Sequence, residues 1–143
     1  MKVIINTDFG GFGISEKAFE LYKQRTGFES LPSHRCDEYY RDDPIMISVI
    51  EELAEEGNDR YSSLEVVEIP DDYGYAIDEY DGLETIILCI KEKRLRELIR
   101  LGNENDIVEY VKRTQYNYYH AEEDDEDEDQ GNKSPALCLS VQR

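Results

Sequence analysis

The sequence predicts an α+β fold in which a small, mostly antiparallel sheet packs against helices, in the order β-α-α-β-β-β-α-α. Two observations predict it. Short runs rich in β-branched residues, such as residues 2–7 and 64–69, have the length of strands and are followed by glycine, proline or aspartate. Between and after these runs, apolar residues recur at helical spacing behind capping residues.

The first strand and the first helix flank a glycine-rich segment. Residues 2–7 (KVIINT) are expected to form a buried strand. Ser15 is a good N-cap, and a helical pattern continues from it until Gly27 ends the helix. Residues 28–41 contain Pro32 and no clear period, so we expect a loop there.

The second helix has the strongest start signal in the chain. Asp43 occupies the cap position and Pro44 the first helical position, and Gly57 closes the segment. The apolar face of this helix is expected to consist of Ile45, Val49, Ile50 and Leu53.

The middle of the chain predicts further strands. Residues 64–69 end at Pro70, and residues 75–80 alternate as an antiparallel partner would, so 64–80 is interpreted as a hairpin. Residues 83–90 suit either a strand or a helix that runs on into the next segment, and their β-branched content favours the strand.

Two helices are expected at the end of the folded part. The first ends at Gly102, and the second, residues 107–113, is begun by Asn105 and Asp106. The inward face of the first is expected to consist of Leu95, Leu98 and Ile99.

The composition excludes several classes of protein. The chain has 143 residues, the length of one domain, and 34 acidic against 16 basic residues give a net charge of −18. Proteins that bind duplex DNA carry a basic face, so direct DNA binding is not expected. The longest apolar run, residues 85–90, is far shorter than the ~20 residues of a membrane span, so no membrane partner is expected. Three widely spaced cysteines indicate a reducing, intracellular setting.

The charge is concentrated near the C-terminal end of the sequence. Residues 122–129 (EEDDEDED) are eight consecutive acids, and such blocks repel themselves and stay solvated. We therefore expect a single α+β domain over residues 1–115 and a disordered acidic tail over residues 116–143. The apolar stretch 135–141 (PALCLSV) is either tail sequence without a function or a short motif that adds to a sheet edge.

The best candidate for a binding site is the segment between the first strand and the first helix. A strand, a glycine-rich turn and a helix N-terminus offer backbone N–H groups to an anion, and aromatic rings there can stack on a base. The loop lacks the lysine of a P-loop and does not match G-x-G-x-x-G. In the other interpretation, the glycines only turn a tight corner while the phenylalanines plug the core. The candidate ligand-binding residues of this loop are Asp8, Phe9, Gly10, Gly11, Phe12, Gly13 and Ser15.

Arg41 is added to the candidate site because it lies near the start of the second helix and can clamp a phosphate or carboxylate with two hydrogen bonds. No catalytic triad, zinc set or kinase signature is present, so catalytic residues, metal ligands and cofactors are not assigned. Catalysis would require Asp8 and the acids of residues 71–81 to converge on a metal.

The one basic segment of the sequence is residues 91–100 (KEKRLRELIR), with five cations and two acids. A basic amphipathic helix contacts RNA, an acidic partner or a membrane surface. In the internal alternative, the acidic residues 122–129 lie over this helix and screen its charge.

Four motifs in order resemble a group of short, uncharacterised proteins of bacteriophages and large DNA viruses. They are VIINTDFGGFGIS (3–15), RDDP with the following VIEEL (41–53), LEVVEIPDD (64–72) and IDEYDG (77–82). The resemblance covers residues 2–87; the basic segment and the acidic tail lie beyond it. It implies a viral origin and no established activity.

Two functions follow as hypotheses. The first is a non-enzymatic viral accessory protein, located in the host cytoplasm, that binds a small anionic ligand such as a nucleotide, or a protein partner, through residues 8–15. The alternative is an acidic decoy that occupies a basic protein with residues 122–129. Pairing of an exposed sheet edge with a second copy of the chain stays open.

Overall fold

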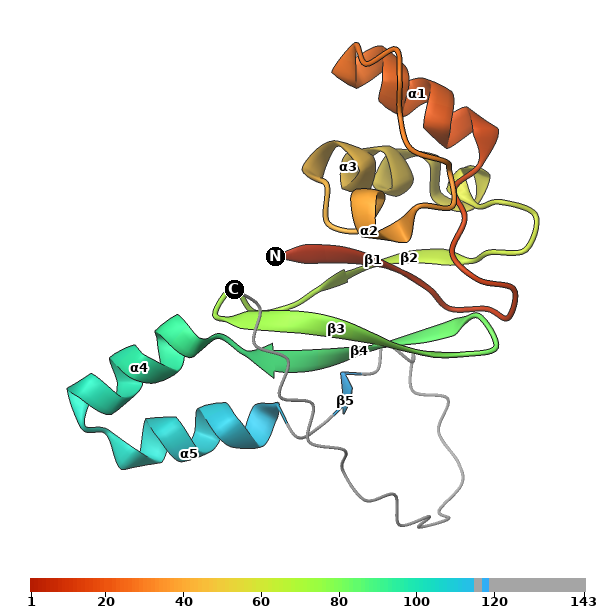
Figure 1. Cartoon of the computed structure of the whole chain (residues 1–143). Coiled ribbons are helices and arrows are strands. Elements are labelled where there is room, and N and C mark those ends of the chain that lie inside the picture. The colour runs from red at the N-terminus through yellow and green to blue at the C-terminus, as the bar shows by residue number, and fades with distance from the viewer. Residues whose placement is uncertain (115–116, 119–143) are drawn as a thin grey trace. The chain divides into compact units, whose positions relative to one another are not determined.

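The computed structural model describes residues 1–114 and 117–118 and confirms the predicted α+β class (Figure 1). The strands are β1 (Lys2–Asn6), β2 (Leu64–Glu68), β3 (Tyr73–Tyr80), β4 (Leu83–Ile90) and β5 (Asn117–Tyr118). The helices are α1 (Glu16–Thr26), α2 (Asp37–Tyr40), α3 (Pro44–Leu53), the 3-10 turn η1 (Ala54–Gly57), α4 (Glu92–Leu101) and α5 (Glu104–Arg113).

The contacts divide the chain into two compact units. Unit 1 comprises residues 1–70 and 78–85, and unit 2 comprises residues 71–77 and the described residues from 86 onward. β3 and β4 therefore contribute residues to both units. A single domain over residues 1–115 stays a prediction.

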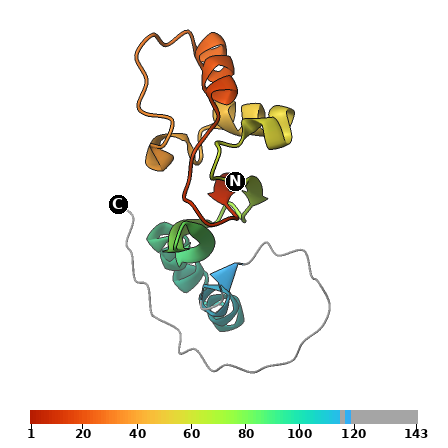
Figure 2. The same ribbon diagram turned by 90° about the vertical axis from the view of Figure 1, so that its right-hand side faces the viewer.

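Unit 1 is built on an antiparallel pair of strands. β1 pairs with β2 over five residues, from Lys2 opposite Glu68 to Asn6 opposite Leu64. In Figure 2, α1 and α3 lie on one side of this pair. Ile4 of β1 belongs to the same buried cluster as residues of both helices, so the helices and the strand pair share one core. Its buried members are Ile4, Ile14, Ala18, Tyr22, Tyr40, Met46, Ile47, Val49 and Ile50.

The helix boundaries of unit 1 follow from capping. The Ser15 hydroxyl accepts a hydrogen bond from the Ala18 N–H, and Gly27 ends α1 in the left-handed conformation, as predicted. Asp43 caps α3 by accepting from two backbone N–H groups. The predicted apolar face of α3 was wrong at Ile45, which is 37 % exposed, because Met46 takes its place in the core.

Unit 2 contains a helical hairpin of α4 and α5. Tyr73 stacks on Tyr110 of α5 with ring centroids 4.6 Å apart, and the Tyr110 hydroxyl accepts from the Lys91 N–H at 2.9 Å. Burial raises the pKa of the Tyr73 hydroxyl above its ordinary value. Leu98 is buried as predicted, whereas Ile99 is 58 % exposed and does not face inward.

The predicted strand pairing was wrong. Residues 64–80 do not form a hairpin: β2 pairs with β1, and β3 is the neighbour of β4 in a second sheet of order β3-β4-β5. Residues 83–90 form a strand, as favoured. The local spacing of residues 64–80 predicted a hairpin because it carries no information about β1, more than fifty residues earlier in the chain, with which β2 pairs.

Three smaller expectations also need correction. Residues 28–41 are not all loop, since α2 occupies Asp37–Tyr40. α5 begins at Glu104 behind the cap Asn103, three residues earlier than expected, because the Asn103 side chain accepts from the Asp106 N–H. Residues 117–118, predicted to be part of a disordered tail, form β5. The remaining tail, including 122–129 and 135–141, lies outside the described residues. No described helix is long and apolar enough to cross a membrane.

We expect Asp43→Ala to lower the free energy of unfolding by about 1 kcal/mol, because two N–H groups of the first turn of α3 lose their acceptor. Asp42→Ala is the matched control, since Asp42 is exposed and caps no helix. Urea denaturation of both variants measures the difference; equal midpoints would contradict the assignment.

Candidate functional site

The glycine-rich loop of residues 8–15 lies against two other loops of unit 1. The Gly10 N–H donates to the Asp81 carbonyl at 3.3 Å. A Cβ at Gly82 would lie 2.3 Å from the Gly11 nitrogen, and a Cβ at Gly10 would lie 2.4 Å from the Tyr61 carbonyl oxygen. Both glycines also have positive φ, +90° and +131°. The glycines are therefore required for the close approach of three backbone segments.

Asn6, at the end of β1, holds these segments together. Its side-chain N–H groups donate to the carbonyls of Asp8 and Gly82, both at 2.6 Å, and its side-chain oxygen accepts from the Ser63 N–H at 2.8 Å. Asn6 is fully buried; its bond to the Gly82 carbonyl is buried, and its bonds to Asp8 and Ser63 are partly buried. One amide thus positions the start of the glycine-rich loop, the β3–β4 turn and the segment before β2.

Arg41 is buried and engaged within unit 1. Its guanidinium donates to both oxygens of Glu84, at 2.8 and 3.0 Å, to Asp37 at 2.6 Å and to the Ile4 carbonyl at 2.8 Å. Burial lowers the pKa of the guanidinium, but the hydrogen bonds and charges of Glu84 and Asp37 outweigh this, and the pKa of Arg41 is raised. Arg41 is 3 % exposed, so the expected clamp for an external anion is instead part of an internal ion pair.

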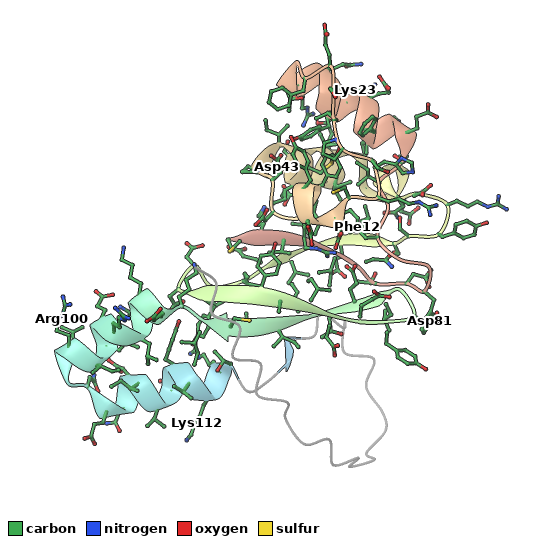
Figure 3. All side chains as sticks on the ribbon, in the orientation of Figure 1. Phe12, Lys23, Asp43, Asp81, Arg100 and Lys112 are labelled. Carbon is green, nitrogen blue, oxygen red and sulfur yellow. The ribbon has the colours of Figure 1, made fainter. Side chains whose placement is uncertain are left out.

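The two phenylalanines of the loop have different environments. Phe12 is half-buried beside the core and its ring lies 4.8 Å from the Arg41 guanidinium carbon (Figure 3). Phe9 is 58 % exposed. The interpretation in which both rings plug the core therefore holds for Phe12 and not for Phe9.

Phe9 is one of three exposed aromatic residues that lie on or beside the three backbone segments that meet. Tyr61 is 56 % exposed and Tyr80, beside the β3–β4 turn, is 79 % exposed. We call Phe9, Tyr61 and Tyr80, with the loop residues beside them, the aromatic end of unit 1. Figure 3 labels Asp81 at the turn that carries Tyr80.

The charge beside these rings is mainly negative. Asp8 and Asp81 are exposed on these loops, and Glu79 is exposed near the end of β3. The cation beside them is Arg60, whose guanidinium lies 5.2 Å from the centre of the Tyr61 ring. A cation–π contact of this kind is therefore already formed within the aromatic end.

A pocket of about 490 Å³ opens near the N-terminus of α1. It is lined by Ile14, Glu16, Phe19, Glu20, His34 and Asp59. Three of these side chains are carboxylates, so the pocket favours a cation and disfavours a phosphate despite the helix N-terminus beside it. Asp59, which lines the pocket, is followed in the sequence by Arg60 and Tyr61 of the aromatic end.

The predicted site residues divide into three groups, of which the buried Arg41 and the core-packed Phe12 form the first. Asp8, Phe9, Gly10 and Gly11 lie at the aromatic end. Gly13 and Ser15 instead pack against residues 56–62: the Gly13 carbonyl accepts from the Ser62 hydroxyl at 2.6 Å, and the Ser15 hydroxyl donates to the Glu56 carbonyl at 2.7 Å.

Sequence reasoning missed Asn6, Tyr61, Tyr80 and Glu84. A signal existed for two of them, because Asn6 ends an apolar strand and Glu84 interrupts another. A polar residue in such a run is a candidate for a buried hydrogen-bond network.

The described residues contain no group of three or more His, Cys, Asp or Glu side chains that could hold a metal ion. Asp8 and the acids of residues 71–81 therefore do not form such a group. Comparisons with protein-family models, curated proteins and solved structures find no match to this chain.

We expect Gly82→Ala to lower the free energy of unfolding by about 1–3 kcal/mol, because its Cβ would overlap the Gly10 and Gly11 nitrogens at a positive φ. Gly27→Ala is the control for the conformational cost alone: it also has positive φ but no atom within 4 Å of the added Cβ. A Gly82→Ala loss no larger than that of Gly27→Ala, measured by urea denaturation, would argue against close loop packing.

Glu84→Gln should destabilise unit 1 by about 3 kcal/mol, because it leaves the buried Arg41 charge without its main partner. Asp37→Asn removes the other ion-pair partner, whose side chain is 44 % exposed, and should cost about 1 kcal/mol or less. Thermal and urea denaturation compare the two; similar losses would show that Glu84 is not the dominant partner.

Proposed function

We propose that this chain is a non-enzymatic viral accessory protein that binds a protein partner through the aromatic end of unit 1. The observation that carries the proposal is the exposure of Phe9, Tyr61 and Tyr80 on or beside three segments that hydrogen bonds of the buried Asn6 side chain hold together. The viral origin and the host cytoplasm as its location come from the sequence resemblance alone.

Exposed aromatic side chains are favourable contact residues. Tyrosine and phenylalanine bury a large apolar area at a small cost in side-chain entropy, and aromatic residues are enriched in protein interfaces. Asn6 fixes the backbone beside these side chains, so binding costs little conformational entropy in these segments. A preorganised aromatic surface therefore supports a binding function.

The local charge favours a basic partner over a small anion. Asp8, Glu79 and Asp81 surround the rings, and the positive charge of Arg41 is neutralised in the interior. Arginine and lysine side chains of a partner would gain both carboxylate contacts and cation–π contacts, as Arg60 does on Tyr61.

The pocket beside α1 fits the same kind of partner. Its volume of about 490 Å³ accommodates a long side chain, and Glu16 provides a carboxylate for a guanidinium or ammonium group. The other two carboxylates, Glu20 and Asp59, already pair with Lys23 and Arg35, so a partner's cation would share them. Phe19 adds an apolar wall for the methylene stem.

Two alternatives remain as proposals. A nucleotide bound by residues 8–15 would raise the melting temperature in a thermal-shift screen, with no shift expected if the partner is basic. A decoy that acts through residues 122–129 would lose its basic partner when these eight acids are replaced by amides.

The test uses a fluorescent arginine- and lysine-rich peptide and the full chain with residues 122–129 changed to QQNNQNQN, so that these acids do not capture the peptide. We expect binding by anisotropy to weaken about tenfold or more in the variant Phe9→Ala, Tyr61→Ala, Tyr80→Ala. Phe28→Ala, which removes another exposed ring (53 %) of unit 1, is the control and should leave the Kd unchanged.

Preference for an acidic peptide or for nucleotides, or equal Kd values for the triple variant and Phe28→Ala, would contradict the proposal. Circular dichroism of the variants verifies that the exposed substitutions leave the fold intact.

A further inference from the structure

Helix α4 of the α4–α5 hairpin in unit 2 carries four cations and two acids, a basic surface that the proposed function does not use. On α4, Arg94 pairs with Glu97 at 3.0 Å, and Arg96 pairs with Glu92. Lys93 and Arg100 are exposed, and neither has an ion-pair partner among the described residues. Figure 3 labels Arg100 on α4 and Lys112 on α5.

The same two helices also expose apolar side chains. Ile99 and Leu101 of α4 are 58 % and 69 % exposed, and Val108 of α5 is 50 % exposed. Leu98 and Tyr110, in contrast, are buried. The hairpin therefore offers both cations and apolar residues to a ligand, whereas a purely solvated helix face would offer charge alone.

We propose that residues 122–141 of the same chain bind this surface, with the acids 122–129 on the cations of α4 and the apolar residues 135–141 on the exposed apolar side chains. The segment has the same two components as the hairpin: eight consecutive acids are followed, five residues later, by PALCLSV. Both charge and hydrophobicity are thus complementary.

The length of the chain permits the contact. β5 pairs with residues 86 and 87 of β4, and α4 begins six residues after Ile86, about 20 Å along the strand. α4 adds about 15 Å. Asp129 is eleven residues beyond the end of β5 and reaches up to about 40 Å from it at ~3.6 Å per residue. The last residues of the acidic block therefore reach the whole of α4, whereas Glu122, four residues beyond β5, reaches only about 14 Å. Residues 135–141 reach farther.

Attachment to the same chain strengthens the contact. A tethered segment has an effective concentration on the order of millimolar at its site, so even weak electrostatic binding is substantially populated. The contact lies within unit 2 and does not depend on the aromatic end.

The test compares backbone amide NMR shifts of the full chain with those of the variant in which residues 122–129 are QQNNQNQN. We expect shift differences on α4 and α5 at about 0.05 M salt that vanish at about 0.5 M, where charges are screened over a few Å. α1 provides internal reference signals. The absence of differences on α4 and α5 at low salt would overturn the proposal.

Charge exchange provides the second measurement. The double variant Lys93→Glu, Arg100→Glu should show the same loss of the contact, seen in the α4 and α5 amide shifts, as the QQNNQNQN variant. Replacing the acids of residues 122–129 by lysines in this double variant should restore the contact and the α4 shifts. Failure of this exchange to restore them would show that charge pairing is not responsible. Leu137→Ser, Leu139→Ser and Val141→Ser should reduce the differences on Ile99 and Val108 only.

Dilution distinguishes binding by the segment of the same chain from binding by the segment of a second copy. Shifts that do not change with protein concentration support binding within one chain. Shifts that disappear on dilution, together with a dimer in sedimentation, would show that the segment comes from a second copy and would overturn the proposal as stated.

Discussion

The buried ion pair between Arg41 and Glu84 is the constraint on which unit 1 depends. Burying two charges is costly, and the cost is offset here only because nearly every donor and acceptor is used. Glu84 also accepts from the Asn6 N–H at 2.8 Å, and the Arg41 carbonyl accepts from the Ile4 N–H at 2.7 Å. The pair therefore fixes β1, the end of α2 and the start of β4 relative to one another.

The glycines of the loop are explained by packing within unit 1 and not by a ligand. Asn6 draws the loop against Gly82, and the lack of a Cβ at Gly10 and Gly82 lets the backbones approach. The Phe12 ring lies 4.8 Å from the Arg41 guanidinium carbon and packs against the core, whereas Phe9 is exposed. The loop therefore contributes one ring to the interior and one to the aromatic end.

Local chemistry was predictable from the sequence, and long-range partners were not. Asp43 and Gly27 were recognised because a cap acts on N–H groups or carbonyls within a few residues. β2 was given the wrong partner because strand pairing is decided by side chains far away in the chain. Arg41 was placed toward a ligand because its residue type does not reveal that Glu84, 43 residues later, neutralises it.

The two surfaces carry opposite charge, and this gives the net charge of −18 a more specific meaning. Eight of the negative charges are in residues 122–129, and the proposed contact would offset part of them with the four cations of α4. Beside Phe9, Tyr61 and Tyr80 lie Asp8, Glu79 and Asp81, together with Arg60 on the Tyr61 ring. If α4 occupies the acidic block, a basic partner meets the aromatic end first, and the block becomes available only when its contact with α4 is broken. The choice of partner then depends on where each group of charges lies, and the net charge of the whole chain does not predict it.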